Sequence, residues 1–329
     1  MRDRSRMDDP FSDILTFTNA RSVVAGGFVA GGAWAIRFPP PDRIKFFAVV
    51  RGRCWLAIDG DDAAIPIAEG DVFLLARQCS FVLASELGLA PLEARRLFEG
   101  RVDAIVQVGD GDDTLQIGGH VRLDPAYGDL LTGVLPPLIH VRAASAEAGI
   151  LRWLLDQLVQ EGSAQRPGCG VASAQLAQLM LIQILRAHFA TSGPLAAGWL
   201  RAASDPRIAP ALRLMHGDPG RSWQLGQLAK AAAMSRTTFA LYFKSVAGVA
   251  PLTYLTGWRM RLATRALREE SISVAALARR LGYSSESAFS NAFKRTVGVA
   301  PRRYRSGAET ATPGEAALRS DRHPPVRAM

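Results

Sequence analysis

Short apolar runs separated by turn residues fill much of the first 128 residues. The runs occupy residues 45–50, 53–58, 63–68, 72–76, 81–85 and 114–124. Strands this short, at this regular spacing, are typical of a small antiparallel barrel or sandwich. We therefore predict a β-rich domain over residues 1–128.

Apolar positions recur at helical spacing from about Asp129 onward. One stretch places five apolar side chains on one side of a helix: Ile150, Leu151, Leu154, Leu155 and Leu158. A second, more apolar stretch covers residues 171–190 and either packs in the core or forms the contact of a homodimer. No uninterrupted apolar run reaches the about 18 residues that a membrane helix needs. Residues 129–204 are therefore predicted as a helical dimerisation and linker region without membrane contact.

The C-terminal part contains one pattern twice, 50 residues apart. The first copy comprises Phe239, Phe243, Lys244, Gly248, Val249, Ala250, Pro251 and Tyr254, and the second Phe289, Phe293, Lys294, Gly298, Val299, Ala300, Pro301 and Tyr304. A short helical stretch precedes each copy, and the second copy has one extra residue in its turn. Each copy predicts a helix-turn-helix, with Ser235 as helix N-cap in the first and Ser284 or Ser285 in the second.

The second helix of each copy has two different faces at ~100° per residue. Aromatic and branched side chains cluster inward: Phe239, Tyr242, Phe243 and Val246, and likewise Phe289 and Phe293. The outward faces carry Thr237, Ala240, Leu241 and Lys244 in the first copy, and Ser287, Ser290, Asn291 and Lys294 in the second. Short polar side chains let a helix enter a major groove and reach base edges, and lysine contacts phosphate. The alternative is an ordinary bundle surface, which does not account for the matched spacing of the two copies.

Positive charge is concentrated around these two copies. Residues 205–306 carry 17 Lys and Arg against 5 Asp and Glu, a net +12 in a chain whose total is +9. A local excess of this size is expected of a domain that binds a polyanion. The helix from Pro251 connects the copies and would hold two reading helices one DNA turn apart, ~34 Å. Its arginines are candidates for phosphate contacts or for solubility: Arg259, Arg261, Arg265 and Arg268. Residues 307–329 are rich in Ala, Pro and charges, which predicts a disordered tail.

Two stretches resemble the two halves of the DNA-binding domain of the AraC/XylS-type (arabinose-regulator) family. They are "MSRTTFALYFKSVAGVAPLTYLTGWRMRLA" and "GYSSESAFSNAFKRTVGVAPRRYR". "FPPPDRIKFFAVVRGRCWLAIDG" and "GDVFLLAR" are similar to the cupin-like N-terminal domain of one branch of that family. The resemblance implies an α+β protein: a cupin-like antiparallel β-barrel as effector sensor, helices, and an all-α C-terminal domain with two helix-turn-helix units joined by a connecting helix.

The family implies a bacterial, cytoplasmic transcription regulator, more commonly an activator than a repressor, that binds promoter DNA and works with RNA polymerase. Carried over to this chain, the DNA-contacting residues are Arg236, Thr237, Ala240 and Leu241 in the first unit and Glu286, Ser287, Ser290 and Asn291 in the second. The family often has arginines at the positions of Leu241 and Tyr242. Leu241 contacts only apolar features such as a thymine methyl group. Glu286 either accepts a hydrogen bond from cytosine or favours the helix N-terminus.

Cupin barrels often hold a catalytic metal, so a metal-dependent enzyme is the alternative class. The histidines are His120, His140, His188, His216 and His323. Only His120 falls in the predicted strand region, which leaves three converging ligands unobtainable. We therefore expect no metal, no cofactor and no catalysis.

The barrel instead offers aromatic walls for a small-molecule effector, or the same residues simply form its core: Trp34, Phe47, Trp55 and Phe81. A second alternative is a thiol-based redox sensor at Cys79, because Arg77 lies nearby and a cation favours the reactive thiolate. Cys54 alternates along a strand and is predicted to lie in the core. Three widely spaced cysteines and an N-terminus without a secretion signal indicate a reducing cytoplasm.

Overall fold

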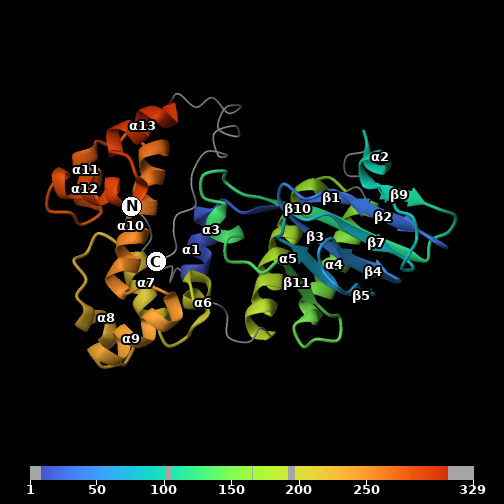
Figure 1. Ribbon diagram of the computed structural model, residues 1–329, viewed down its shortest axis with the longest axis horizontal. Helices are drawn as coiled ribbons and strands as arrows, with labels where there is room; N and C mark the ends of the chain where they lie inside the picture. The colour runs from blue at the N-terminus through green and yellow to red at the C-terminus, as the bar shows by residue number, and fades with distance from the viewer. Residues whose placement is uncertain (1–8, 101–104, 165, 192–196, 310–329) are drawn as a thin grey trace. The chain divides into compact units, whose positions relative to one another are not determined.

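The computed structural model describes residues 9–100, 105–164, 166–191 and 197–309 (Figure 1). The chain divides into two compact units. The sheet unit is Ile14–Pro194, and the helical unit is Met1–Asp13 with Leu195–Met329. The region predicted at 129–204 is therefore split between the two units, with the boundary after Pro194.

Two β-sheets form the centre of the sheet unit. The strands are β1 (Arg21–Ala30), β2 (Ala35–Phe38), β3 (Ile44–Arg51), β4 (Arg53–Ile58), β5 (Ile65–Ala68), β6 (Val72–Leu75), β7 (Phe81–Ala84), β8 (Leu92–Glu93), β9 (Ile105–Val108), β10 (Thr114–Arg122) and β11 (Leu138–Val141). One sheet has the order β11-β6-β3-β10-β1-β9 and the other β5-β4-β7-β2-β8. Neighbours are antiparallel except for β1 with β9 and β2 with β8. Over the described residues the sheets do not close into one barrel, so the expected antiparallel barrel is an open, mixed arrangement of two sheets.

The core of this unit lies between the two sheets. One buried cluster contains Phe47 and Phe73 from the first sheet with Leu56 and Phe81 from the second. Phe81 also stacks on Phe38 with ring centroids 4.8 Å apart. Because side chains alternate along a strand, the residues between these positions face away from the core.

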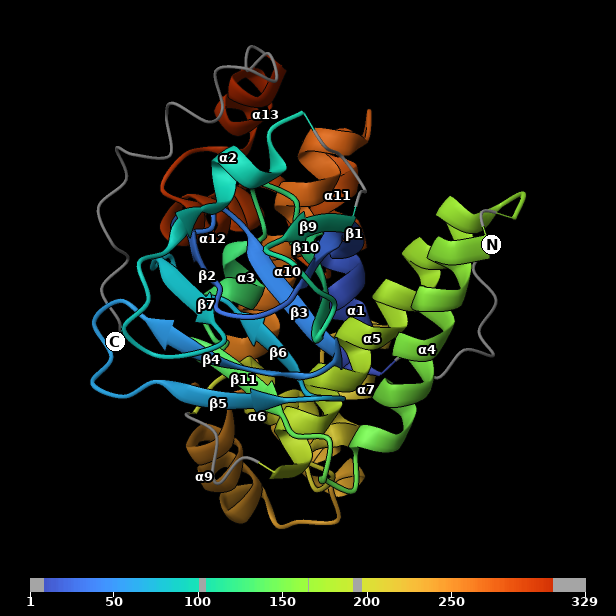
Figure 2. The ribbon, with the colours of Figure 1, turned by 90° about the vertical axis from the view of Figure 1, so that its right-hand side faces the viewer.

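Helices cover the outer face of the six-stranded sheet. α4 (Ala148–Ala164) and α5 (Cys169–Thr191) lie side by side, and α5 contacts β1, β6 and β11 (Figure 2). The buried leucines of α4 are four of the five apolar positions that the sequence placed on one side; Ile150 is exposed. By length and composition α5 would pass as a membrane-spanning helix. In the structure one side of α5 is buried, including Met180, Leu181 and Ile184, as in an amphipathic helix that covers a sheet. The sheet unit also contains two short helices, α2 (Ala94–Phe98) and α3 (Asp129–Thr132). A third, α1 (Pro10–Phe17), crosses the boundary between the two units.

The six strands predicted from apolar runs are confirmed as β3, β4, β5, β6, β7 and β10. Five further strands were not predicted. β1 contains Gly26 and Gly27, which interrupt its apolar pattern, and β8 has only two residues. β11 falls after Asp129, in the region predicted as helical, so that prediction was wrong at 138–141. Its four residues complete the edge of the sheet by pairing with β6.

The helical unit contains the two predicted helix-turn-helix motifs. Its helices are α6 (Trp199–Ser204), α7 (Ala209–Gly217), α8 (Leu225–Ala231), α9 (Arg236–Ala247), α10 (Pro251–Glu269), α11 (Val274–Arg280), α12 (Glu286–Val297) and α13 (Pro301–Glu309). Phe239, Phe243, Phe289 and Phe293 are each 0% exposed. Burial of one such side chain stabilises the fold by about 1.5–3 kcal/mol, so the repeated aromatic pair anchors α9 and α12. The disordered tail expected at 307–329 lies outside the described residues from 310 on, and its first three residues end α13.

Candidate functional sites

The two helix-turn-helix motifs are built by the same turn. In the first, Met234 N donates to Ala229 O at 3.0 Å, and in the second Tyr283 N donates to Ala278 O at 3.0 Å. The residue before each donor has a positive φ, 52° at Ala233 and 78° at Gly282. The matching bonds show that α8–α9 and α11–α12 are copies of one unit.

Serine side chains begin both reading helices. Ser235 Oγ accepts from Thr238 N at 3.2 Å, and Ser285 Oγ accepts from Ala288 N at 3.0 Å. Ser284, exposed before the second cap, is the extra residue of that turn. Of the two caps left open by the sequence, Ser285 is therefore the one used.

The outward face of α9 carries the side chains predicted for DNA contact. Arg236, Thr237, Leu241 and Lys244 are exposed, and Ala240 is partly exposed. Leu241 is 67% exposed and lies one helical turn from Thr237. A single exposed leucine is common on protein surfaces, so its position among polar residues is the informative feature. Tyr242, predicted inward, is only partly buried.

Tyr242 belongs to a separate contact at the side of α9. Its hydroxyl donates to Asp205 Oδ2 at 2.7 Å, and the Arg207 guanidinium lies 4.1 Å from its ring centroid. The hydrogen bond to Asp205 raises the pKa of Tyr242, because the neutral phenol is the donor. Tyr242 therefore fastens α9 to the segment before α7.

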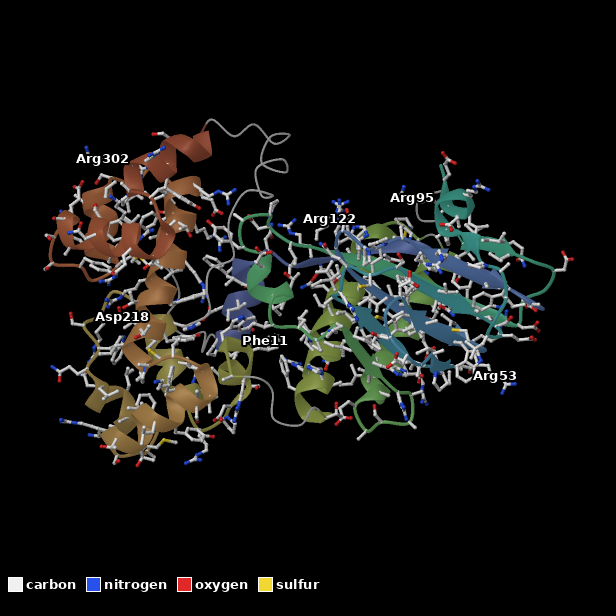
Figure 3. The ribbon with its side chains drawn as sticks, in the orientation of Figure 1. Phe11, Arg53, Arg95, Arg122, Asp218 and Arg302 are labelled. Atoms are coloured by element: carbon white, nitrogen blue, oxygen red, sulfur yellow. The ribbon has the colours of Figure 1, made fainter. Side chains whose placement is uncertain are left out.

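The outward face of α12 carries shorter and more polar side chains than that of α9. Ser287, Asn291 and Lys294 are exposed, and Ser290 is partly exposed. Glu286 forms an ion pair with Arg302, with Nη2 and Oε1 3.1 Å apart. Arg302 projects from α13 and is 82% exposed (Figure 3). The sequence did not place Arg302 beside this face, because only the fold brings α13 against α12.

The connecting helix α10 uses two of its arginines within the protein. Arg259 donates from Nε to Pro219 O at 2.6 Å and from Nη2 to Arg221 O at 2.8 Å. These bonds hold the segment after α7, which gives Arg259 a structural role within the helical unit. Arg265 pairs with Glu269 one turn along the same helix, at 2.9 Å.

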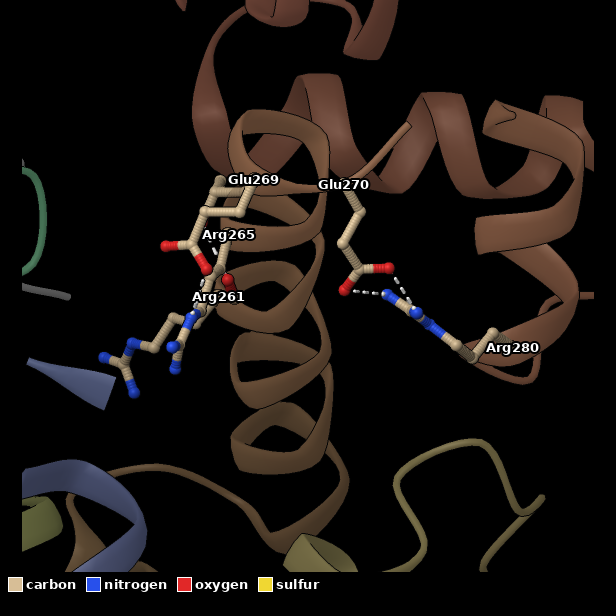
Figure 4. A network of polar contacts seen from close by, with 6 residues as sticks. Arg261, Arg265, Glu269, Glu270 and Arg280 are labelled. Carbon is tan, nitrogen blue, oxygen red and sulfur yellow. Dashed lines mark hydrogen bonds and ion pairs between the residues drawn. The ribbon is translucent and has the colours of Figure 1, made fainter. Parts of the chain in front are cut away.

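A bidentate ion pair joins the end of α10 to α11. Arg280 Nη1 and Nη2 lie 2.6 and 3.2 Å from the two carboxylate oxygens of Glu270 (Figure 4). A bidentate geometry is the more directional form of this contact. Because Arg280 is the last residue of α11, the pair ties the end of α10 to the point where the turn into α12 begins.

A cavity of about 100 Å³ opens among β1, β3 and β10 in the sheet unit. Phe47 lines it, together with other residues: Ala25, Gly26, Gly27, Phe28, Phe38, Lys45, Phe98, Gln116, Gly118 and Gly119. Of the other predicted effector residues, Trp34 and Phe81 lie in the adjoining core. Trp55 is on the opposite face of β4 and lines an outer groove with Arg53. Phe47 is thus the predicted wall residue at this cavity, whereas Trp34 and Trp55 line two other pockets at the surface.

The cysteines differ in surroundings. Cys54 is buried, and burial raises the pKa of its thiol to about 11 while Gln116 Nε2 donates to its Sγ at 3.0 Å. Cys79 is partly buried against the core. The guanidinium of Arg77 pairs with Asp61 at 2.9 Å, so its charge is shared with a carboxylate.

Two of the histidines hold structural positions. His140 lies in β11, outside the strands predicted from sequence, and its Nε2 is 2.9 Å from Asp71 Oδ2. His216 is buried, with Nδ1 2.9 Å from Asp13 Oδ2 and Nε2 3.0 Å from the Tyr254 hydroxyl. Within the described ranges, no group of three or more His, Cys, Asp and Glu side chains is placed to hold a metal ion.

Comparisons with known proteins agree with this architecture. The family model described as Cupin matches residues 9–190, and the model described as Helix-turn-helix domain matches residues 228–307. An AraC-like transcription regulator of Streptomyces antibioticus is 44% identical over 297 residues, 90% of this chain and 98% of that protein. One of Streptomyces lividans is 42% identical over the same shares.

A solved structure also matches the helical unit. The DNA-binding domain of AdpA, determined in complex with a target DNA, is 30% identical; the match covers 35% of this chain and 98% of that chain, with a TM-score of 0.30. The extent and identity of the full-length matches decide the family. The chain belongs to the AraC-like transcription regulators, with an N-terminal cupin domain and a C-terminal DNA-binding helix-turn-helix domain, and it is a regulator rather than an enzyme.

Proposed function

We propose that the protein binds promoter DNA through the exposed faces of α9 and α12 and activates transcription with RNA polymerase when a small molecule occupies its sheet unit. The observation that carries the DNA-binding proposal is the pair of turns closed by the same hydrogen bond, each leading into a serine-capped helix with a short polar outward face. The net +12 of residues 205–306 supports it, because binding to phosphates dominates affinity for DNA.

The two reading faces differ in what they recognise. On α12, Asn291 offers an amide that pairs bidentately with adenine. On α9, Leu241 offers only apolar contact, which suits a thymine methyl group. Glu286 is held by Arg302, so its role in this proposal is to position the start of α12 and to keep Arg302 beside the DNA backbone.

Gel shifts with the full chain test this proposal. Candidate sites come from genome-wide binding of the tagged protein. Asn291→Ala is expected to weaken a specific site about 5- to 150-fold, because a good bidentate contact discriminates by ~1–3 kcal/mol, while non-specific binding stays unchanged. Lys294→Ala is expected to weaken all sequences and to reduce the salt slope by about 1.

Arg95→Ala is the matched control, since it also removes one exposed positive charge but from α2 in the sheet unit (Figure 3). Equal losses for Lys294→Ala and Arg95→Ala would refute a specific role for α12. A promoter reporter then gives the sign of regulation: activation predicts lower expression when the gene is deleted.

A homodimer is the oligomeric state we propose, through the helices α4 and α5. Both helices expose large apolar side chains on their surfaces: Ile150, Trp153, Val171 and Leu179. Trp153→Glu is expected to shift the mass measured by sedimentation from dimer to monomer. A monomeric wild-type chain at micromolar concentration would contradict the proposal.

Oxidation of Cys79 is the competing signal for the sheet unit. Its partial exposure supports access by small oxidants, although Arg77 is paired. Replacement by Ser that leaves the oxidant response of a reporter unchanged would remove this alternative.

A further inference from the structure

The cavity beside Phe47 has a floor without side chains. Gly118 on β10 lies between Gly26 on β1 and Phe47 on β3 in the register of the sheet. Two of the three residues at this level are therefore glycines. A Cβ at Gly118 would lie 3.0 Å from the Phe47 ring, so the ring packs flat against the strand where a larger residue would collide.

The walls of the cavity are aromatic. Phe28, Phe38, Phe47 and Phe98 line it, and the Phe38 ring is 5.4 Å from Phe47 and 6.3 Å from Phe98 between centroids. Its volume is about 100 Å³. An apolar cavity of ~150 Å³ accommodates one benzene molecule. A ligand with one ring, partly outside at the open side, is therefore the size that fits.

One end of the cavity has an unsatisfied hydrogen-bond acceptor. Gln116 is 0% exposed and lies two residues from Gly118 on the same strand and face. Its Nε2 donates to Cys54 Sγ at 3.0 Å, whereas its Oε1 is buried and has no partner among the described residues. An unmet buried acceptor is costly, and a ligand with a hydroxyl or N–H group would supply the missing donor.

The other end carries positive charge. Lys45 also lines the cavity and pairs in register with His120, two residues from Gly118 on the opposite side from Gln116. Lys45 is partly buried and forms no ion pair within the described part of the chain. Burial lowers the pKa of Lys45, with Asp42 acting against this and Arg43 adding to it. Burial is also the largest cause that lowers the pKa of His120; the neighbouring cations Arg43, Arg122 and Lys45 add to it, and Asp42 acts against it.

The spacing of the two polar ends matches a short ligand. Gln116 and His120 are four residues apart along β10, which is roughly 14 Å between their backbones. The side chains of Gln116 and Lys45 both line the cavity and occupy part of that length. A ligand with one ring and a polar group at each end is short enough to lie between them.

We propose that this cavity binds a one-ring amphipathic anion. Its ring lies over Gly118 among the phenylalanines, its carboxylate accepts hydrogen bonds from Lys45, and a hydroxyl or N–H at its far end donates to Gln116 Oε1. The chemical class is an aromatic acid with a second, hydrogen-bond-donating substituent. The claim that this ligand is the regulatory signal rests on the proposed function, whereas the claim that the cavity binds it does not.

Titration calorimetry on the full chain tests the proposal with three probes. 4-Hydroxybenzoate carries both polar groups, 4-hydroxybenzamide lacks the charge, and benzoate lacks the donor. We expect 4-hydroxybenzoate to bind at least about tenfold more tightly than the amide, because hydrogen bonds to charged groups are the stronger kind. It should also bind about 2- to 10-fold more tightly than benzoate.

Substitutions separate the two ends of the cavity. Lys45→Met should abolish the preference for acid over amide, and Gln116→Leu should abolish the preference for 4-hydroxybenzoate over benzoate. Arg95→Met, at an exposed position of α2 that does not line the cavity, is the control for loss of one charge, and it should bind like the wild type. The probe series on the wild-type chain remains decisive if a variant fails to fold.

The proposal is overturned if none of the probes binds at millimolar concentration, if the amide binds as well as the acid, or if Lys45→Met leaves the acid's affinity unchanged. Gel shifts on the same samples keep this apart from the proposed function. Specific DNA binding without ligand binding refutes only the ligand, whereas ligand binding without specific DNA binding refutes only the DNA interface.

Discussion

The turn between α11 and α12 packs closely against the segment after α7. Gly282 has φ of 78°, and a Cβ there would lie 2.0 Å from Gly220 O. An L-residue in this conformation costs about 1–2 kcal/mol. The segment that would have to move is held by the two hydrogen bonds from Arg259, and overpacking typically adds about 1–3 kcal/mol. Gly282→Ala is thus expected to destabilise the helical unit by roughly 2–5 kcal/mol.

Ala233, at the same place in the first turn, is the matched control with the opposite sign. Its φ is 52°, so Ala233→Gly relieves about 1–2 kcal/mol of strain. The greater freedom of glycine in the unfolded chain takes back about 0.4–1 kcal/mol. The net expectation is a change between none and a stabilisation of about 1.6 kcal/mol.

Hydrogen exchange resolved by peptide measures both changes where they occur. Peptides across 274–297 should exchange faster in Gly282→Ala at all urea concentrations below the unfolding transition, while peptides of the sheet unit stay unchanged. Peptides across 225–247 should be slightly better protected in Ala233→Gly. The reasoning fails if Gly282→Ala lies within about 0.5 kcal/mol of the wild type, the range of ordinary surface substitutions, or if Ala233→Gly is the more destabilising of the two.

Three further predictions concern single side chains. Ser235→Ala and Ser285→Ala should each lower the stability of the helical unit by about 1 kcal/mol through loss of the helix cap, measured by urea unfolding followed by helical circular dichroism; no loss for either would contradict the capping bonds. Iodoacetamide at pH 8 should label Cys79 well before Cys54, whose pKa of about 11 keeps it protonated at that pH; mass spectrometry that finds Cys54 labelled first would contradict its burial. Burial acts to raise the pKa of Asp71, but hydrogen bonds from a histidine and two backbone N–H groups outweigh it and hold the pKa below the usual value. The stability from this carboxylate is therefore complete above about pH 3.9 and is lost as pH falls below it, so Asp71→Asn should flatten the acid limb of the sheet unit's unfolding curve.

The two helix-turn-helix motifs could be predicted from the sequence because each structural requirement of the motif places a particular residue type at a fixed spacing. Buried aromatic anchors recur as Phe239 and Phe289, and the helix ends recur as Gly248 and Gly298, both with positive φ. Such requirements act within one short segment, so they can be recognised in a single sequence. The choice between two adjacent serines for the second cap needed the structure, because either could begin the helix by pattern alone.

The ligand cavity could not be predicted from the sequence in the same way. Gly118, Lys45 and Gln116 come together only through the register of β10 with β3, and register is not written in either strand alone. The aromatic residues were recognised, but alternation along β4 sends Trp55 to the outer face. The structural role of Arg259 was not predicted for a related reason, since its partners are backbone carbonyls about 40 residues away in the chain. Contacts of this kind depend on tertiary packing rather than on local pattern.

Hydroxyl-radical footprinting of the full chain on a specific site tests the central claim most directly. The account predicts two protected segments whose centres are one helical turn apart, ~34 Å. Asn291→Ala should remove protection over one segment, and Thr237→Ala with Leu241→Ala should weaken the other. Protection of a single segment, or loss of both segments to the same degree with each variant, would contradict the claim that α9 and α12 read DNA as two separate units.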